Sequence, residues 1–213
     1  MKLINQIKLN KLIEEHNSYI ETIKSKELRG KKLILDDIDF KDNILSELNF
    51  LETYISSSYF GNKTLENINF GGAKLYDCIF ENITFINCDF GRTVLDYAKI
   101  INSKFINCNF NNLETIETQF EKIILEHCNI NSMFSDCVVK DGKFINCIFY
   151  SIDFWQCILK NLKIYPLKNP FNVKEIIKKI NIGTLETPIY IQNEEAVEYF
   201  KKVCDIYYGR KIS

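Results

Sequence analysis

Large apolar residues return at every fifth position along most of the chain. From Leu35 to Ile164 the five-residue step meets Leu, Ile, Val or Phe, apart from Thr115 and one skipped residue between Ile130 and Phe134. A period of five matches neither the 3.6-residue turn of a helix nor the two-residue alternation of a long strand. The pattern therefore predicts a chain that changes direction after every five residues.

The position two residues before each large side chain is also restricted, and it carries mostly Ala, Cys, Ile or Leu. Residues two apart in an extended segment share a face, so both positions point inward and the others form corners. The motif FINC at Phe85 returns twenty residues later at Phe105, LEHC follows at Leu125, and FINC returns nineteen residues on at Phe144. Four five-residue sides per coil predict a square solenoid over residues 32–165, with nearly seven coils stacked about 4.8 Å apart.

The five-residue units CDFGR, CNFNN and IDFKD resemble those of the pentapeptide-repeat proteins. The resemblance implies an all-β solenoid, specifically a right-handed quadrilateral parallel β-helix, with helical segments at both ends. Members of this family include proteins that bind DNA gyrase and protect it from quinolones or peptide toxins. The sequence departs from the commonest unit by preferring Cys or Ile to Ala at the inward small position.

Seven of the eight cysteines occupy that inward position, and Cys88, Cys108, Cys128 and Cys147 are predicted to form one column. Core packing is the preferred interpretation, because a thiol there fits beneath the next coil. A zinc site needs ligands that converge as a tetrahedron, whereas stacked side chains run parallel. The parallel direction and a reducing compartment also disfavour disulfides.

Catalysis finds little support in the residues. The chain has two histidines, and His127 should point outward while its neighbour Cys128 points inward, so they cannot act as base and nucleophile together. Gly71 and Gly72 fall at a corner, where turn geometry explains them. A filled rod offers no pocket, so we expect no enzyme activity, no catalytic residue, no cofactor and no metal.

The ends of a solenoid need caps. Residues 1–31 are predicted to form a helical cap with Gly30 as its stop, using the helical stripe Leu9, Leu12, Ile13, His16, Ile20 and Ile23. His16 is interpreted as a residue at the boundary of this helix, not as a ligand.

Residues 166–213 are predicted to be a mainly helical segment that covers the last coil and could also form a homodimer. Asn172 would cap a first helix with Val173, Ile176, Ile177 and Ile180, and a short strand would begin at Ile189. Asn193 would open a second helix, which runs to Gly209 with Val197, Phe200, Cys204 and Tyr207 along one stripe.

Charge and composition narrow the set of partners. The chain has 27 basic and 28 acidic residues, which removes a general electrostatic attraction to nucleic acid or to membranes. The first sixteen residues lack the apolar run of a secretory signal, so a cytoplasmic location with reduced cysteines is expected. Richness in Lys, Asn and Ile is typical of an AT-rich bacterial genome.

Two functional hypotheses follow. The first is a non-catalytic, rigid scaffold for an unknown protein partner, with a possible contact patch on the outer surface at Ile86, Ile106, Ile145, Tyr150 and Trp155. The alternative is a DNA mimic that binds a topoisomerase and gives quinolone or toxin resistance. Residues 31–165 hold eighteen acidic and thirteen basic side chains, with a local acidic cluster at Asp36, Asp37, Asp39, Asp42, Glu47 and Glu52. The excess of acidic over basic side chains is small compared with duplex DNA, which carries one charge per about 1.7 Å of its length.

Overall fold

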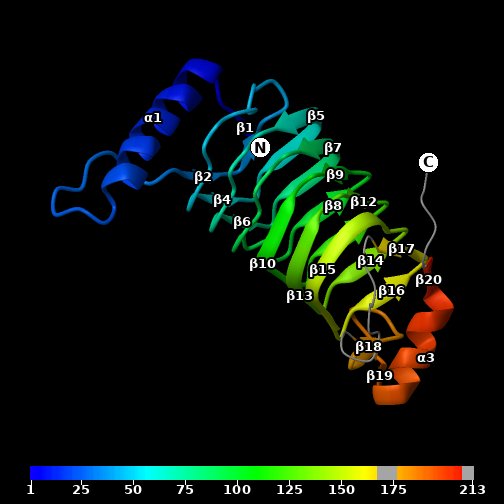
Figure 1. The fold of residues 1–213 in the computed structure, drawn as a ribbon. Coiled ribbons are helices and arrows are strands. Elements are labelled where there is room, and N and C mark those ends of the chain that lie inside the picture. The colour runs from blue at the N-terminus through cyan, green and yellow to red at the C-terminus, as the bar shows by residue number, and fades with distance from the viewer. Residues whose placement is uncertain (167–176, 208–213) are drawn as a thin grey trace.

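The chain winds into a parallel β-solenoid of about seven coils, with a helix at each end (Figure 1). The structure is a computed structural model that describes residues 1–166 and 177–207. Helix α1 (Gln6–Thr22) lies at the N-terminal end of the rod, and helix α3 (Asn193–Val203) lies at the C-terminal end. Successive coils pair in parallel at a spacing of twenty residues, which confirms the square solenoid predicted from the five-residue period.

The four sides of each coil stack into four faces, which we call A to D in chain order. Face A contains β1 (Lys2–Leu3), β3 (Ile38–Asp39), the first halves of β5 (Tyr59–Glu66) and β7 (Ile79–Ile86), β8 (Lys99–Ile101), β11 (Gln119–Glu121), β14 (Val138–Lys140) and β16 (Ile158–Lys160). Face B contains the second halves of β5 and β7, β9 (Lys104–Ile106), β12 (Ile124–Glu126), the start of β15 (Lys143–Trp155), β17 (Leu162–Pro166) and β20 (Cys204–Ile206).

The other two faces are less regular at the N-terminal end. Face C contains the isolated bridges between Asn49, Asn69, Asp89 and Asn109, the first halves of β10 (Asn109–Ile116) and β13 (Asn129–Ser135), and the middle of β15. Face D contains β2 (Ile34–Asp36), β4 (Tyr54–Ser56), β6 (Lys74–Tyr76) and the second halves of β10, β13 and β15. Strands β5, β7, β10 and β13 each turn one corner and join two faces, whereas β15 turns two corners and joins faces B, C and D.

The large residues of the five-residue pattern fill the inside of the rod. Phe90 and Phe110 are 1% and 5% exposed, and their rings stack at 5.3 Å. Phe85 stacks on Phe105 at 4.8 Å and meets Phe90 of the adjoining face edge-on at 5.2 Å. Burial of each such side chain contributes about 1.5–3 kcal/mol, and offset or edge-on ring pairs add to it. The predicted columns are therefore confirmed as the core.

Left-handed backbone marks the corners. Corner residues such as Asn87, Asn107 and Gly72 have φ of 53°, 54° and 64°, a region that Asn and Gly adopt most readily. The N–H of Asn87 donates to the carbonyl of Ile106 in the next coil at 2.9 Å. Every coil thus closes its corner hydrogen bonds on its neighbour.

The skipped residue near Asn131 appears as a local change of register. Asn131 pairs with Asn111, but Ser132 pairs with Leu113, so Asn112 has no counterpart. The following coil recovers the residue, because Phe149 pairs with Ile130 and Ser151 with Asn131. Tyr150 bulges between them and is 67% exposed.

The N-terminal cap follows the predicted helical stripe in part. Leu9, Ile13 and His16 are buried, whereas Ile23 lies beyond the end of the helix and is 45% exposed. The prediction that Gly30 stops the helix is wrong, since α1 already ends at Thr22. Gly30 instead has a φ of 69° and lies so close to the backbone of α1 that a Cβ there would meet the Glu15 carbonyl oxygen at 2.0 Å.

The C-terminal segment contains more strand than predicted. Asn172, Val173, Ile176 and Gly209 lie outside the described residues, but Ile180 belongs to strand β18 (Lys179–Asn181), not to a helix. β18 bridges the last coil at Cys157 and pairs in antiparallel fashion with β19 (Tyr190–Gln192), the strand expected near Ile189.

The second predicted helix is shorter than expected. Helix α3 ends at Val203, because Cys204–Ile206 form β20, which pairs with β17 and adds a rung to face B. Val197, Phe200 and Cys204 are buried as predicted, and Phe200 lies against Phe154 at the open end of the core. No helix among the described residues is long and apolar enough to cross a membrane.

Candidate binding surfaces

The interior of the rod leaves no room for a substrate. A void of about 20 Å³ lies among Leu95, Phe105, Phe120 and neighbouring apolar side chains. Such a space is close to the size of one water molecule, and an apolar lining keeps it dry. Any chemistry or recognition by the coils must therefore use their outer faces.

The cysteines are buried in the positions that core packing predicts. All eight are free thiols. Stacking places four of them in one column: Cys88, Cys108, Cys128 and Cys147. The N–H that follows each of the last three cysteines donates to the carbonyl of the cysteine one coil earlier. Burial raises the pKa of Cys78 to about 12, and contact with the Cys128 thiol raises the pKa of Cys108 to about 12. Such thiols stay protonated near neutral pH, where they are poor nucleophiles and metal ligands.

The two histidines are separate from the thiol column. His127 lies at a corner with a φ of 55° and its side chain is 48% exposed, as predicted, while Cys128 is fully buried. His16 is fully buried between two backbone groups: Leu33 N–H donates to its Nδ1 at 3.0 Å, and its Nε2 lies 2.8 Å from the Leu51 carbonyl oxygen. His16 thus joins the cap to the first coils. Among the described residues, no cluster of His, Cys, Asp and Glu suits a metal ion.

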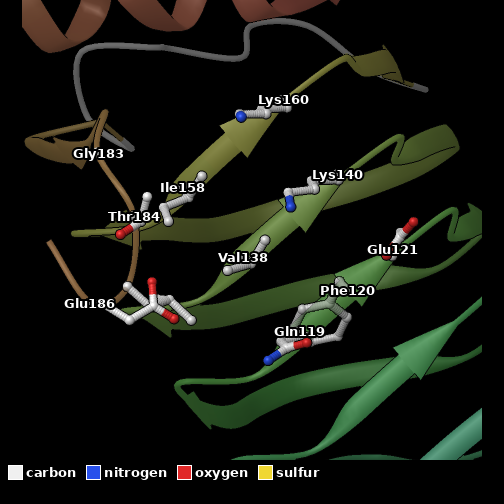
Figure 2. A pocket seen from close by; sticks show the side chains of 11 residues that line it. Gln119, Phe120, Glu121, Val138, Lys140, Ile158, Lys160, Gly183, Thr184 and Glu186 are labelled. Atoms are coloured by element: carbon white, nitrogen blue, oxygen red, sulfur yellow. The ribbon is translucent and has the colours of Figure 1, made fainter. Parts of the chain in front are cut away.

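The described part of face A carries a groove of about 250 Å³, which we call the hairpin groove. One wall is the loop between β18 and β19, and the residues that line the groove are Gln119, Phe120, Glu121, Val138, Lys140, Ile158, Lys160, Gly183, Thr184, Leu185 and Glu186. Figure 2 shows Val138 and Ile158 between the loop on one side and two lysines, Lys140 and Lys160, on the other. The groove therefore combines an apolar floor with a basic edge.

The two carboxylates of the hairpin groove already have partners. Glu121 lies 3.9 Å from the ammonium of Lys122. Hydrogen bonds from its own backbone and from the Thr184 hydroxyl hold the pKa of Glu186 below its usual value, so this carboxylate is bound within its own turn. Lys140 and Lys160 thus remain available to a ligand.

The five residues of the predicted contact patch fall on more than one face. Ile86 and Ile106 are neighbours on face B and are half-buried. Glu126 separates Ile106 from Ile145 on the same face. Trp155 lies on face D opposite Ser135, and Tyr150 is the bulged residue between faces C and D. The structure therefore brings Ile86 and Ile106 together and keeps the two aromatic residues away from them.

Trp155 has a partner that the sequence did not indicate. The ammonium of Lys179 lies 5.6 Å from the centre of its ring and 4.2 Å from that of Tyr190 on β19. Both rings remain about two-fifths exposed. Lys179 thus links the end of face D to the hairpin through cation–π contacts.

Sequence reasoning missed the hairpin groove and its lysines. One signal was present, because Lys140 and Lys160 are twenty residues apart, as are Lys143 and Lys163. The same period that stacks the FINC motifs stacks these lysines. The loop that closes the groove carries no comparable signal, since its position depends on how β18 bridges the last coil.

A comparison with models of protein families matches one stretch of the coils. The family model described as "Pentapeptide repeats" matches residues 73–112 in eight copies. No curated protein matches the sequence significantly.

Three solved structures are similar to part of the chain. A trypsin-treated form of QnrB1, a plasmid-mediated fluoroquinolone resistance protein, is 12% identical over 63% of this chain and 80% of its own, with a TM-score of 0.26. The pentapeptide-repeat protein Rfr23 from the cyanobacterium Cyanothece 51142 is 17% identical over 53% of this chain and 60% of its own, with a TM-score of 0.26. HetL from Nostoc sp. strain PCC 7120, involved in heterocyst differentiation regulation, is 11% identical over 68% of this chain and 86% of its own, with a TM-score of 0.27.

Proposed function

Because residues 73–112 match the pentapeptide-repeat family model, we propose that the chain is a pentapeptide-repeat protein that acts as a non-catalytic scaffold and binds a protein partner on the outside of a rigid rod. One observation carries the proposal: the interior is closed by apolar columns, while the outer faces present stacked side chains at fixed spacing. Such a surface is pre-organised, so a partner that binds it does not have to order it first.

Several surface features of the described residues are suited to this role. Ile86 and Ile106 form a small apolar step on face B, the Trp155 and Tyr190 rings form an aromatic end to face D, and the hairpin groove opens on face A. Aromatic residues are enriched at the centres of protein interfaces. Each feature lies on a different face, so the face that binds a partner can be identified experimentally.

Photo-cross-linking from single positions tests the proposal. A photoreactive residue would replace Ile106 on face B, Trp155 on face D or Lys160 at the hairpin groove, and each protein would be exposed to an extract of the native cell. A scaffold should give one cross-linked protein from one face or two adjoining faces, and an excess of unlabelled wild-type protein should compete for it. The absence of a competed product from every position would contradict the proposal.

The acidic first coil supports topoisomerase binding as the alternative. This coil contains Asp36, Asp37 and Asp39, but the Asp37 carboxylate lies 3.3 Å from the N-terminal ammonium, which reduces its effect. Later coils carry lysines on faces A and B, so the rod lacks the uniform charge of duplex DNA. Inhibition of gyrase supercoiling, or its rescue from a quinolone, would favour the alternative; an inert protein at micromolar concentration would remove it.

A homodimer through the C-terminal segment stays a prediction that sedimentation would test.

A further inference from the structure

Two pairs of lysines face each other on neighbouring strands of the last two coils. Lys140 on β14 is in register with Lys160 on β16, and Lys143 on β15 is in register with Lys163 on β17. In the strand registers of the described residues, no other like-charged side chains are paired. Like charges directly opposite each other on adjacent strands are destabilising.

The two lysine pairs meet at the corner between faces A and B, and we call these four residues the basic corner. Within residues 1–166 and 177–207, no carboxylate lies within 4 Å of any of their ammonium groups, unlike Lys104, which binds Glu126 at 2.6 Å. The corner carboxylate Asp141 accepts a hydrogen bond from the Asn161 amide at 2.6 Å. Glu121 on β11 is in register with Lys140, and Asp205 on β20 is in register with Lys163, so carboxylates border the basic corner. The four ammonium groups of the basic corner nevertheless have no ion-pair partner within 4 Å among the described residues.

The hairpin groove adjoins the basic corner, because Lys140 and Lys160 belong to both. Its floor offers the apolar side chains of Val138 and Ile158 (Figure 2). The exposed Leu185 belongs to the loop between β18 and β19 that forms the opposite wall. A polyanion such as nucleic acid would use the lysines but would find no phosphate partner on this floor. An acidic protein segment with an apolar side chain would use both.

We infer that the basic corner and the hairpin groove together bind an acidic segment of a protein partner, with carboxylates on Lys140 and Lys160 and an apolar side chain over Val138 and Ile158. The inference rests on the proposed scaffold function and assigns the chemistry of its partner. The bound carboxylates offset the repulsion between Lys140 and Lys160, and a groove of about 250 Å³ limits the apolar contact to a short part of the segment.

Fluorescence anisotropy with a labelled synthetic peptide of alternating Glu and Leu tests the inference. The wild type should bind it, and the double variant Lys140→Gln, Lys160→Gln should bind at least about tenfold more weakly. The matched control is Lys74→Gln, Lys99→Gln, which removes the same charge from exposed positions in earlier coils. Its affinity should stay within about twofold of the wild type, as expected for isolated surface charges.

Three further probes examine the chemistry of the site. Peptides that alternate Gln with Leu, or Glu with Gly, should both bind more weakly than the Glu and Leu peptide. A single-stranded oligonucleotide with the same number of charges should also bind more weakly. Tighter binding of the oligonucleotide, equal loss in the control variant, or no binding of the Glu and Leu peptide would each overturn the inference.

Thermal unfolding without peptide separates a binding role from a structural one. Removal of the Lys140 and Lys160 charges should leave the unfolding temperature unchanged or raise it at low salt, and salt near 1 M should abolish any gain by screening. A large fall in this temperature would overturn the inference, because the lysines would then stabilise the fold. If a cross-linked partner still binds the double variant with full affinity, the scaffold proposal survives while this inference fails.

Discussion

At the scale of single residues, position within the five-residue unit decides the role of each side chain. Phe90 and Cys88 are both buried because they occupy the two inward positions of one unit, whereas Asn87 occupies the corner just before them. Thr115, the one polar residue on the large position, is 2% exposed and donates to the Met133 carbonyl at 3.3 Å. Burial here follows from position, and a polar side chain is tolerated only where it is hydrogen-bonded.

His16 should make the stability of the protein sensitive to mild acid. Burial, assisted by the charge of Lys32, holds the pKa of His16 below its ordinary value of 6.5, although the bond to the Leu51 carbonyl opposes this shift. The unfolded state therefore binds a proton more readily as the pH falls below 6.5. The contribution of His16 is complete above that pH and decreases as the pH falls toward the lowered pKa.

The variant His16→Leu provides the measurement. At pH 8 it should be less stable than the wild type by about 1–3 kcal/mol, because the Leu33 N–H and the Leu51 carbonyl lose their buried partner. Urea unfolding should show this difference shrinking between about pH 7 and pH 5. A difference that stays constant with pH would refute the prediction, and His127→Leu serves as the control at an exposed corner.

At the scale of elements, the corners decide where each short strand ends. Asn107 has a φ of 54°, and its N–H donates to the Glu126 carbonyl of the next coil at 3.0 Å. The chain can turn there only with left-handed backbone, which an L-residue with a Cβ adopts at a cost of about 1–2 kcal/mol. The repeated Asn residues at corners reflect this requirement.

Substitutions at Asn107 should reverse the usual order of alanine and glycine. Asn107→Gly should be more stable than Asn107→Ala by about 1 kcal/mol, since both lose the amide but only Ala keeps a Cβ at positive φ. Thr84, on an extended part of β7, is the control, where Ala should be more stable than Gly by about 0.5–1 kcal/mol. Chemical denaturation of the four variants measures both differences, and the same order at the two positions would contradict the role of the corner.

At the scale of the whole molecule, each coil contacts only its neighbours, so the ends must be closed separately. At the C-terminal end, Phe200 of α3 is fully buried and lies 6.4 Å from Phe154 between ring centres. Solenoid stability is close to a sum of local terms, so damage at one end need not spread along the rod.

Phe200→Ala should therefore loosen the last coil without unfolding the first ones. Replacing a buried Phe by Ala lowers the free energy of unfolding by about 3–5 kcal/mol. Here the loss should be confined to the segment that Phe200 covers. Hydrogen exchange should accelerate at the Asn181 N–H, which bonds the Cys157 carbonyl, and stay unchanged at the Phe70 N–H, which bonds the Asp89 carbonyl. Equal acceleration at both amides would show that the rod unfolds as one unit.

The sequence by itself determined the solenoid, its four sides, its inward thiols and the slip at Asn131, because each of these depends on residues a fixed number of positions apart. Only the tertiary structure decided how the ends close: α3 stops at Val203 so that β20 can pair with β17, and Ile180 joins a strand that bridges Cys157. The exposed strand edge of the last coil forms hydrogen bonds with any segment that can reach it. Helical periodicity in the sequence does not show whether a segment will extend a helix or pair with that edge. The hairpin groove arises in the same way, since its lysines come from the repeat but its opposite wall comes from a loop placed by the end of the rod.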